Sequence, residues 1–115
     1  MAGKDEYVVV WMAAVGAMFD SDDSGPMSEL FAQDCVFTTD DGVWGNNRDE
    51  IMNTLQAARK AGWQSHKTFS ASAADGLMTI IGQNEFADGS RRSVAAVAKF
   101  DDEGRICLMH AIRNI

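Results

Sequence analysis

The chain has 115 residues, enough for one domain that buries roughly two-thirds of the surface its unfolded form exposes. Hydrophobic residues make up 46% and charged residues 23%, a composition that excludes a disordered or low-complexity chain. Ten basic against seventeen acidic side chains give a formal net charge of −7. A surface this acidic repels phosphate backbones, so we expect no nucleic-acid partner.

The first predicted helix covers residues 5–19. Asp5 and Glu6 suit the positive end of a helix, and apolar residues recur at spacings of three and four along one face: Val8, Trp11, Met12, Val15 and Phe19. This apolar run is too short to span a bilayer, and acidic residues stand where a signal peptide carries positive charge. We therefore expect a cytoplasmic protein without membrane association, whose two cysteines, Cys35 and Cys107, are buried free thiols.

A break follows at residues 20–26, because Asp and Ser favour turns and Gly25-Pro26 cannot continue a helix. Residues 27–33 predict a short helix, and residues 35–39 (CVFTT) a strand by their β-branched and aromatic content. Asp40, Asp41 and Gly42 come next, a sequence typical of a tight turn. Asp40 also remains a candidate catalytic carboxylate, since it follows the strand directly and could reach a nearby site.

A second helix begins after Asn47, which can cap it while Glu50, three residues on, completes a capping box. Ile51, Leu55 and Ala58 form its apolar stripe, and Gly62 ends it. Four strand-like runs then follow, separated by Asp-Gly and similar turn signals: residues 63–74, 77–87, 93–100 and 105–115. Helices followed by an antiparallel meander predict a single α+β domain covering residues 1–115.

Two motifs carry a resemblance to a known family. They are Leu30-Phe31-Ala32-Gln33-Asp34 ahead of the first strand and Asn47-Arg48-Asp49-Glu50-Ile51 at the start of the second helix. With the order of elements, they resemble the SnoaL-like and ketosteroid-isomerase-like branch of the nuclear transport factor 2-like superfamily. The resemblance implies a cystatin-like cone, in which N-terminal helices pack on a curved, mostly antiparallel mixed sheet around a ligand cavity. This fold hosts several chemistries and also proteins without catalysis, so it does not fix the reaction.

The catalytic groups of ketosteroid isomerase have no counterpart in this chain. An ungapped alignment on residues 30–34 puts Thr39 at the position of its catalytic aspartate, Val15 at that of its tyrosine, and Ala96 near that of its proton-donating acid. A hydroxyl cannot replace a carboxylate as a base near neutral pH, so that mechanism is disfavoured.

Alternation along the last strands predicts two faces of the sheet. By the resemblance, the cavity face carries these residues: Ile80, Gly82, Asn84, Phe86, Val94, Ala96, Ala98, Phe100, Cys107, Met109, Ala111 and Arg113. The outer face carries Ile106 and an apolar set that predicts a homodimer interface: Ile81, Val97, Leu108, His110 and Ile112. Scattered exposed aliphatic residues are the alternative.

Small inward residues leave room for a cavity that binds a small apolar or weakly acidic molecule. The expected ligand-binding residues are Trp11, Val15, Thr39, Trp44, Trp63, Lys67, Phe69, Asn84, Ala96, Met109 and Arg113, and Phe100 could also line the cavity. Inward Lys67 and Arg113 would suit a carboxylate, enolate or phosphate, unless both simply reach solvent. Methionines that fill the space are the alternative to a cavity.

His66 and His110 are the two histidines, and strict alternation turns both outward. A bulge would reverse His66 and make it, with Asp40, a candidate acid–base residue. No metal-ligand spacing or glycine-rich phosphate loop is present, and we expect neither a metal nor an organic cofactor. Two functions stay open: an acid–base enzyme of isomerase, cyclase or dehydratase type, and a non-catalytic homodimeric module for ligand or protein binding.

Overall fold

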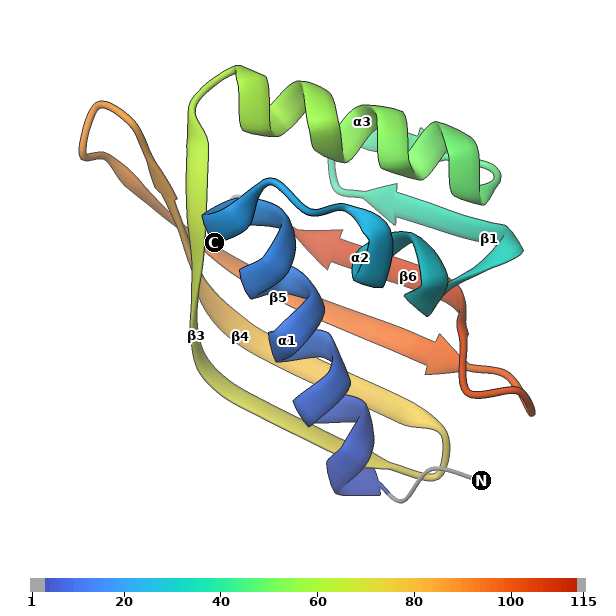
Figure 1. The fold of residues 1–115 in the computed structure, drawn as a ribbon. Helices are drawn as coiled ribbons and strands as arrows, with labels where there is room; N and C mark the ends of the chain where they lie inside the picture. Colours follow the sequence, from blue (N-terminus) through green and yellow to red (C-terminus); the bar gives the residue numbers. More distant parts are fainter. Residues whose placement is uncertain (1–3, 114–115) are drawn as a thin grey trace.

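A computed structural model describes the backbone of residues 4–113 and the side chains of residues 8–62, 72–73 and 75–113. The elements, in chain order, are α1 (Lys4–Ser21), α2 (Gly25–Leu30), β1 (Phe31–Thr39), β2 (Gly42–Gly45), α3 (Arg48–Lys60), β3 (Trp63–Ala74), β4 (Leu77–Phe86), β5 (Arg91–Phe100) and β6 (Ile106–Ile112) (Figure 1). The strands form one sheet in the order β2-β1-β6-β5-β4-β3. β1 runs parallel to β6, and all other neighbours are antiparallel.

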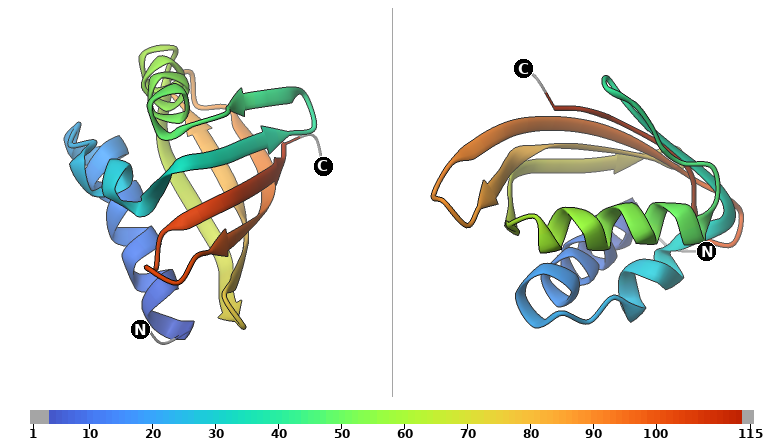
Figure 2. Two further views of the ribbon diagram at one scale, coloured as in Figure 1. Left: turned by 90° about the vertical axis from the view of Figure 1, so that its right-hand side faces the viewer. Right: turned by 90° about the horizontal axis from the view of Figure 1, so that it is seen from above.

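The sheet curves around the helices, which all lie on its concave side (Figure 2). The predicted α+β class and the four-strand meander are confirmed. Strand β2 was not predicted from the sequence. It is a four-residue strand that pairs with the end of β1 across the turn at Asp40 and Asp41, so the predicted turn is confirmed as the tip of a hairpin.

The short helix begins and ends earlier than predicted. α2 already includes Gly25 and carries Pro26 in its first turn, where a missing N–H costs no hydrogen bond. The helix ends at Leu30, and Phe31 begins β1 by pairing with Ile106 of β6. Residues 31–33 were predicted as helix, but here they belong to β1, because pairing with β6 outweighs their local preference for a helix.

Helix α3, which was predicted to begin after Asn47, follows its prediction closely. The Glu50 backbone N–H donates to Oδ1 of Asn47 at 2.9 Å, and the Glu50 carboxylate accepts from the Asn46 N–H at 3.1 Å. Ile51 and Leu55 bury the apolar stripe, and Gly62 follows the helix with a φ of 114°. The capped helix α3 packs across β1 and β2 at one end of the cone.

The two predicted sheet faces are present over most of their length. The inward-facing positions are buried against the helices: Ile80, Val94, Ala98, Met109 and Ala111. The alternate positions on the same strands point outward and leave four large side chains 40–54% exposed: Ile81, Val97, Leu108 and Ile112. The prediction fails at the start of β6. A register shift between Lys99 and Phe100 buries Ile106 completely and leaves Cys107 half-buried, with its thiol donating to the Lys99 carbonyl.

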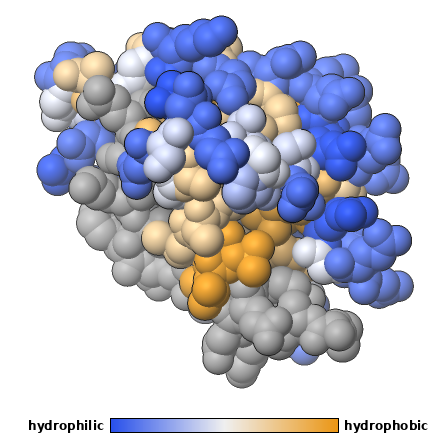
Figure 3. Space-filling view, in the orientation of Figure 1, coloured by the Kyte–Doolittle hydropathy of each residue, from blue (hydrophilic) through white to orange (hydrophobic). Residues whose placement is uncertain are grey.

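Helix α1 is less amphipathic than predicted. Trp11, Val15 and Phe19 are buried as expected, but Met12 is 40% exposed. Together with Val9 and Val10 it leaves apolar side chains on the outer surface of the helix, and Figure 3 shows such a patch on the helix-bearing side of the molecule. Within the part of the chain that the structure describes, no helix is both long and apolar enough to cross a bilayer.

Candidate functional site

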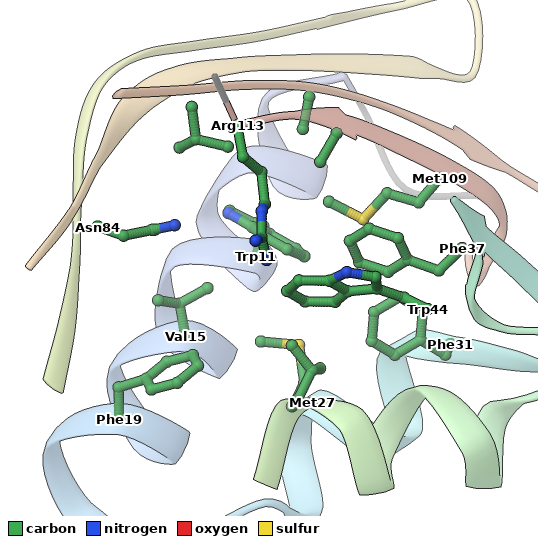
Figure 4. Close-up of a pocket in the computed structure, with 14 residues that line it drawn as sticks. Trp11, Val15, Phe19, Met27, Phe31, Phe37, Trp44, Asn84, Met109 and Arg113 are labelled. Carbon is green, nitrogen blue, oxygen red and sulfur yellow. The ribbon is translucent and has the colours of Figure 1, made fainter. Parts of the chain in front are cut away.

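A small cavity lies between the helices and the concave face of the sheet (Figure 4). Its volume is about 40 Å³, enough for a few water molecules at most. A cavity that holds a typical small organic ligand measures about 300 Å³ or more, so entry of such a ligand requires the lining to move. The residues that line it are Trp11, Val15, Phe19, Met27, Phe31, Phe37, Trp44, Leu55, Asn84, Val94, Ala96, Met109, Ala111 and Arg113.

The walls of the cavity are almost entirely apolar. Helix α1 supplies Trp11, Val15 and Phe19 through the i, i+4, i+8 spacing of one helix face. Opposite them, Phe37 of β1 stacks on Trp44 of β2, with ring centroids 5.2 Å apart and an interplanar angle of 23°. Such walls favour an apolar ligand and exclude bulk water, which strengthens any polar contact made inside.

Asn84 is the buried polar residue among the described side chains that line the cavity. It projects inward from β4, is only 6% exposed, and its Oδ1 has no hydrogen-bond partner among the described residues. Nearly all buried side-chain oxygens in folded proteins accept a hydrogen bond, so among the described residues this atom stands out as an acceptor without a donor. A ligand hydroxyl or N–H, or an ordered water, would satisfy it.

Arg113 is the charged residue among the described side chains that line the cavity. It follows the end of β6, and its guanidinium carbon lies 4.9 Å from the centroid of the Trp44 indole, within cation–π range. One guanidinium nitrogen is 3.3 Å from Oδ2 of Asp41. The side chain is 30% exposed, so Arg113 sits at the mouth of the cavity and faces both solvent and interior.

The acidic turn between β1 and β2 holds Arg113 in place. The Arg113 backbone N–H donates to Oδ1 of Asp40 at 3.2 Å, and the Asp40 N–H donates to the Ala111 carbonyl. Asp41 binds the Arg113 side chain, and its own N–H donates to Oγ1 of Thr39. Thr39 is buried, but its hydroxyl serves this turn and does not line the cavity. Asp40 therefore orients the strand that carries Arg113, and it too lies outside the lining.

The other expected site residues have three different outcomes. Trp11, Val15, Trp44, Asn84, Ala96, Met109 and Arg113 all line the cavity. The side chains of Trp63, His66, Lys67 and Phe69 lie outside the described residues, although the backbone register pairs His66 with Asn84. Phe100 is buried without lining the cavity.

His110 lies on the outer face of the sheet, as predicted. Its Nδ1 shares a hydrogen bond of 2.7 Å with Oγ1 of Thr38, and it borders an apolar hollow on that face together with Val97 and Ile112. His110 is thus separated from the cavity by the sheet itself.

Several lining residues were not assigned to the site from the sequence: Phe19, Met27, Phe31, Phe37 and Leu55. Phe31 was missed because residues 31–33 were predicted as helix, and Phe37 would have followed from alternation with Thr39 on β1. Among the residues whose side chains are described, no group of His, Cys, Asp and Glu could hold a metal ion.

Comparisons with known proteins define the fold. No family model matches the chain, and no curated protein matches it significantly. Solved structures match over nearly its whole length. A protein of Agrobacterium tumefaciens, provisionally assigned as an isomerase of the SnoaL-like family, has a TM-score of 0.78 at 13% identity, over 96% of this chain and 99% of the other.

Two further structures agree. A provisionally assigned polyketide cyclase of Sinorhizobium meliloti gives a TM-score of 0.76 at 18% identity, over 92% and 93% of the two chains. A nuclear transport factor 2-like protein of unknown function from Cytophaga hutchinsonii gives 0.76 at 9% identity, over 94% and 89%. The chain therefore has the SnoaL-like, nuclear transport factor 2-like fold that its sequence motifs predicted.

Proposed function

We propose that the protein binds a small, mostly apolar molecule that carries one acidic group, with the acid held by Arg113 and the apolar body in the cavity. The observation that carries this proposal is the placement of one guanidinium at the mouth of a hollow whose other described lining residues, apart from Asn84, are apolar. A guanidinium matches a carboxylate with two parallel hydrogen bonds, and these bonds strengthen where water is excluded.

Binding of apolar carboxylates to variants of the cavity tests this function. Octanoate, phenylacetate and benzoate should raise the melting temperature of the wild type, and their neutral amides should do so less. Arg113→Gln should abolish the difference between acids and amides. Arg105→Gln is the matched control, because Arg105 also pairs with an exposed carboxylate, Glu103, but lies in the β5–β6 turn. Equal acid responses in wild type and Arg113→Gln would refute the proposal.

Acid–base catalysis on the bound molecule is the second candidate function. It is supported by the isomerase and cyclase assignments of proteins with the same fold, and by the backbone register that pairs His66 with Asn84. The described lining supplies no Asp, Glu or His, and the Asp40 and Asp41 carboxylates both contact Arg113. We therefore propose His66, whose side chain lies outside the described residues, as the proton-transfer group of such a reaction.

Proton exchange separates the two candidates. An enolisable carbonyl compound incubated in D₂O should gain deuterium faster with the wild type than with His66→Ala, if the protein acts as an acid–base catalyst. Equal incorporation by both proteins would leave ligand binding as the function.

We also propose that the outer face of the sheet pairs with a second copy of the chain. Four large aliphatic side chains stand exposed there on three neighbouring strands, Ile81 on β4, Val97 on β5, and Leu108 and Ile112 on β6. Exposed apolar groups concentrated on one face typically mark an interface.

A further inference from the structure

Arg113 already binds a carboxylate, and that carboxylate belongs to the protein. Asp41 contacts the guanidinium through one oxygen at 3.3 Å, and the Asp41 side chain is 53% exposed. An exposed ion pair of this kind contributes little to stability, so another carboxylate can replace Asp41 at small cost. Asp41 therefore occupies the position on Arg113 that an acidic ligand would take.

Arg113 also forms part of the wall of this small cavity. Its guanidinium extends over the Trp44 indole at 4.9 Å, and both side chains line the hollow (Figure 4). With the guanidinium in contact with Asp41 and Trp44, as in this structure, the cavity measures about 40 Å³ and has room for a few water molecules at most. A ligand whose acid group replaces Asp41 would contact the Arg113 guanidinium and would also occupy the mouth of the cavity.

A second feature specifies the other end of the ligand. Oδ1 of Asn84 is buried and has no hydrogen-bond partner among the described residues. Asn84 enters the cavity from β4, whereas Arg113 enters it from the position that follows β6. A ligand that leaves the Asn84 amide unpaired should bind at least about fivefold more weakly than one that satisfies it. The preferred ligand therefore carries a hydrogen-bond donor in addition to its acid.

We propose that the cavity takes a hydroxylated apolar carboxylic acid, whose carboxylate displaces Asp41 from Arg113 and whose hydroxyl donates to Asn84. This inference rests on the proposed binding function. It adds that Asp41 competes with the ligand for Arg113 and that Asn84 forms a second polar contact with the ligand. It predicts that removal of the Asp41 carboxylate strengthens the binding of an acidic ligand because Arg113 is then free of its competitor, and not merely because the net charge of the protein becomes less negative.

Titration with three related probes tests the exchange. The probes are 4-hydroxybenzoate, benzoate and 4-hydroxybenzamide, followed by the indole and side-chain amide signals in ¹H–¹⁵N spectra. Asp41→Asn keeps the side-chain size and the turn preference of the residue while it removes the charge. Relative to the wild type, Asp41→Asn should bind both benzoates about two- to fivefold more tightly, as loss of an exposed pair implies. The neutral amide should show no change.

Asp102→Asn is the matched control for net charge, because Asp102 is exposed in the β5–β6 turn. It should change the affinity for benzoate by less than Asp41→Asn does. Asn84→Leu should remove the preference for 4-hydroxybenzoate over benzoate, which we expect to be at least about fivefold in the wild type. If Asp41→Asn unfolds, Asp41→Ser provides the same comparison.

The outcomes separate this inference from the function on which it rests. If benzoates bind wild type and need Arg113, but Asp41→Asn and Asp102→Asn behave alike, the exchange is refuted and the binding function stands. Weaker binding to Asp41→Asn would also refute it, since Asp41 would then orient Arg113 for the ligand. If Asn84→Leu keeps the hydroxyl preference, the second anchor is wrong. If none of the acids binds any of these proteins, both proposals fail.

Discussion

Trp44 stacks on Phe37 at 5.2 Å between ring centroids, and this contact joins the short strand β2 to the buried part of β1. The same indole lies beneath the Arg113 guanidinium. One aromatic side chain thus closes the hydrophobic core on one side and supports the charged mouth of the cavity on the other.

Trp44→Ala should both destabilise the protein and enlarge its cavity. Because Trp44 is half-buried, we expect a loss of about 1–3 kcal/mol, below the range for a fully buried aromatic side chain. The space left should admit a neutral apolar probe such as benzene. Urea unfolding and benzene-dependent thermal shifts measure the two effects, and Trp44→Phe should retain most of the stability. An unchanged urea midpoint with no response to benzene would contradict the prediction.

The cap of α3 provides a second prediction. Asn47→Ala removes the acceptor of the Glu50 N–H and should cost about 1 kcal/mol in the free energy of unfolding. Asn53→Ala is the control, because Asn53 is exposed within the same helix and caps nothing. Its effect should lie within about 0.5 kcal/mol. Chemical denaturation of the wild type, Asn47→Ala and Asn53→Ala measures these free energies of unfolding. Equal losses of stability in the two variants would exclude the capping role of Asn47.

Much of the fold follows from local signals in the sequence, and the site does not. The capping box at Asn47 and Glu50 and the Asp-Gly turns mark element ends through contacts within a few residues, so they can be recognised along the chain. Strand β2 has no such signal. Its four residues include two glycines, and they are a strand only because β1 offers them hydrogen-bond partners.

The role of the acidic turn shows the same limit more sharply. Asp40 and Asp41 read as a turn, and they do form one. That both carboxylates also bind Arg113, more than seventy positions further along the chain, depends on β1 and β6 lying side by side in parallel. Alternation along the strands likewise predicted which side chains face inward, but not the small volume of the cavity between them.

The two cysteines should differ strongly in reactivity. Burial, with the nearby Cys107 and Asp34 adding to it, raises the pKa of the Cys35 thiol from 9.0 to about 12, so almost no thiolate forms near neutral pH. Cys107 is half-buried and should react first with iodoacetamide at pH 8. Peptide mapping by mass spectrometry identifies the labelled residue. Modification of Cys35 at the same rate as Cys107 would show that the core opens far more readily than its packing implies.

The raised pKa of the Cys35 thiol also predicts how the free energy of unfolding depends on pH. Since the folded state holds the Cys35 proton to about pH 12 and the unfolded state releases it near 9, the stabilisation is complete below pH 9. It should be lost progressively as the pH rises from 9 towards 12. Cys35→Ala removes this group, so its free energy of unfolding should fall less steeply over that range. Parallel slopes for the two proteins would contradict the assignment.

The proposed dimer gives the last prediction. A lysine in place of Ile81, at the exposed centre of β4, would place an unpaired charge in the apolar interface and should convert the dimer to a monomer. Val9→Lys is the matched control, since Val9 is 67% exposed but lies on α1, in the helical layer. Sedimentation velocity at micromolar concentration should show a dimer for the wild type and for Val9→Lys. A monomeric wild type would remove the argument for pairing through the sheet. If Val9→Lys alone dissociated the dimer, the interface would lie instead on the apolar surface of α1.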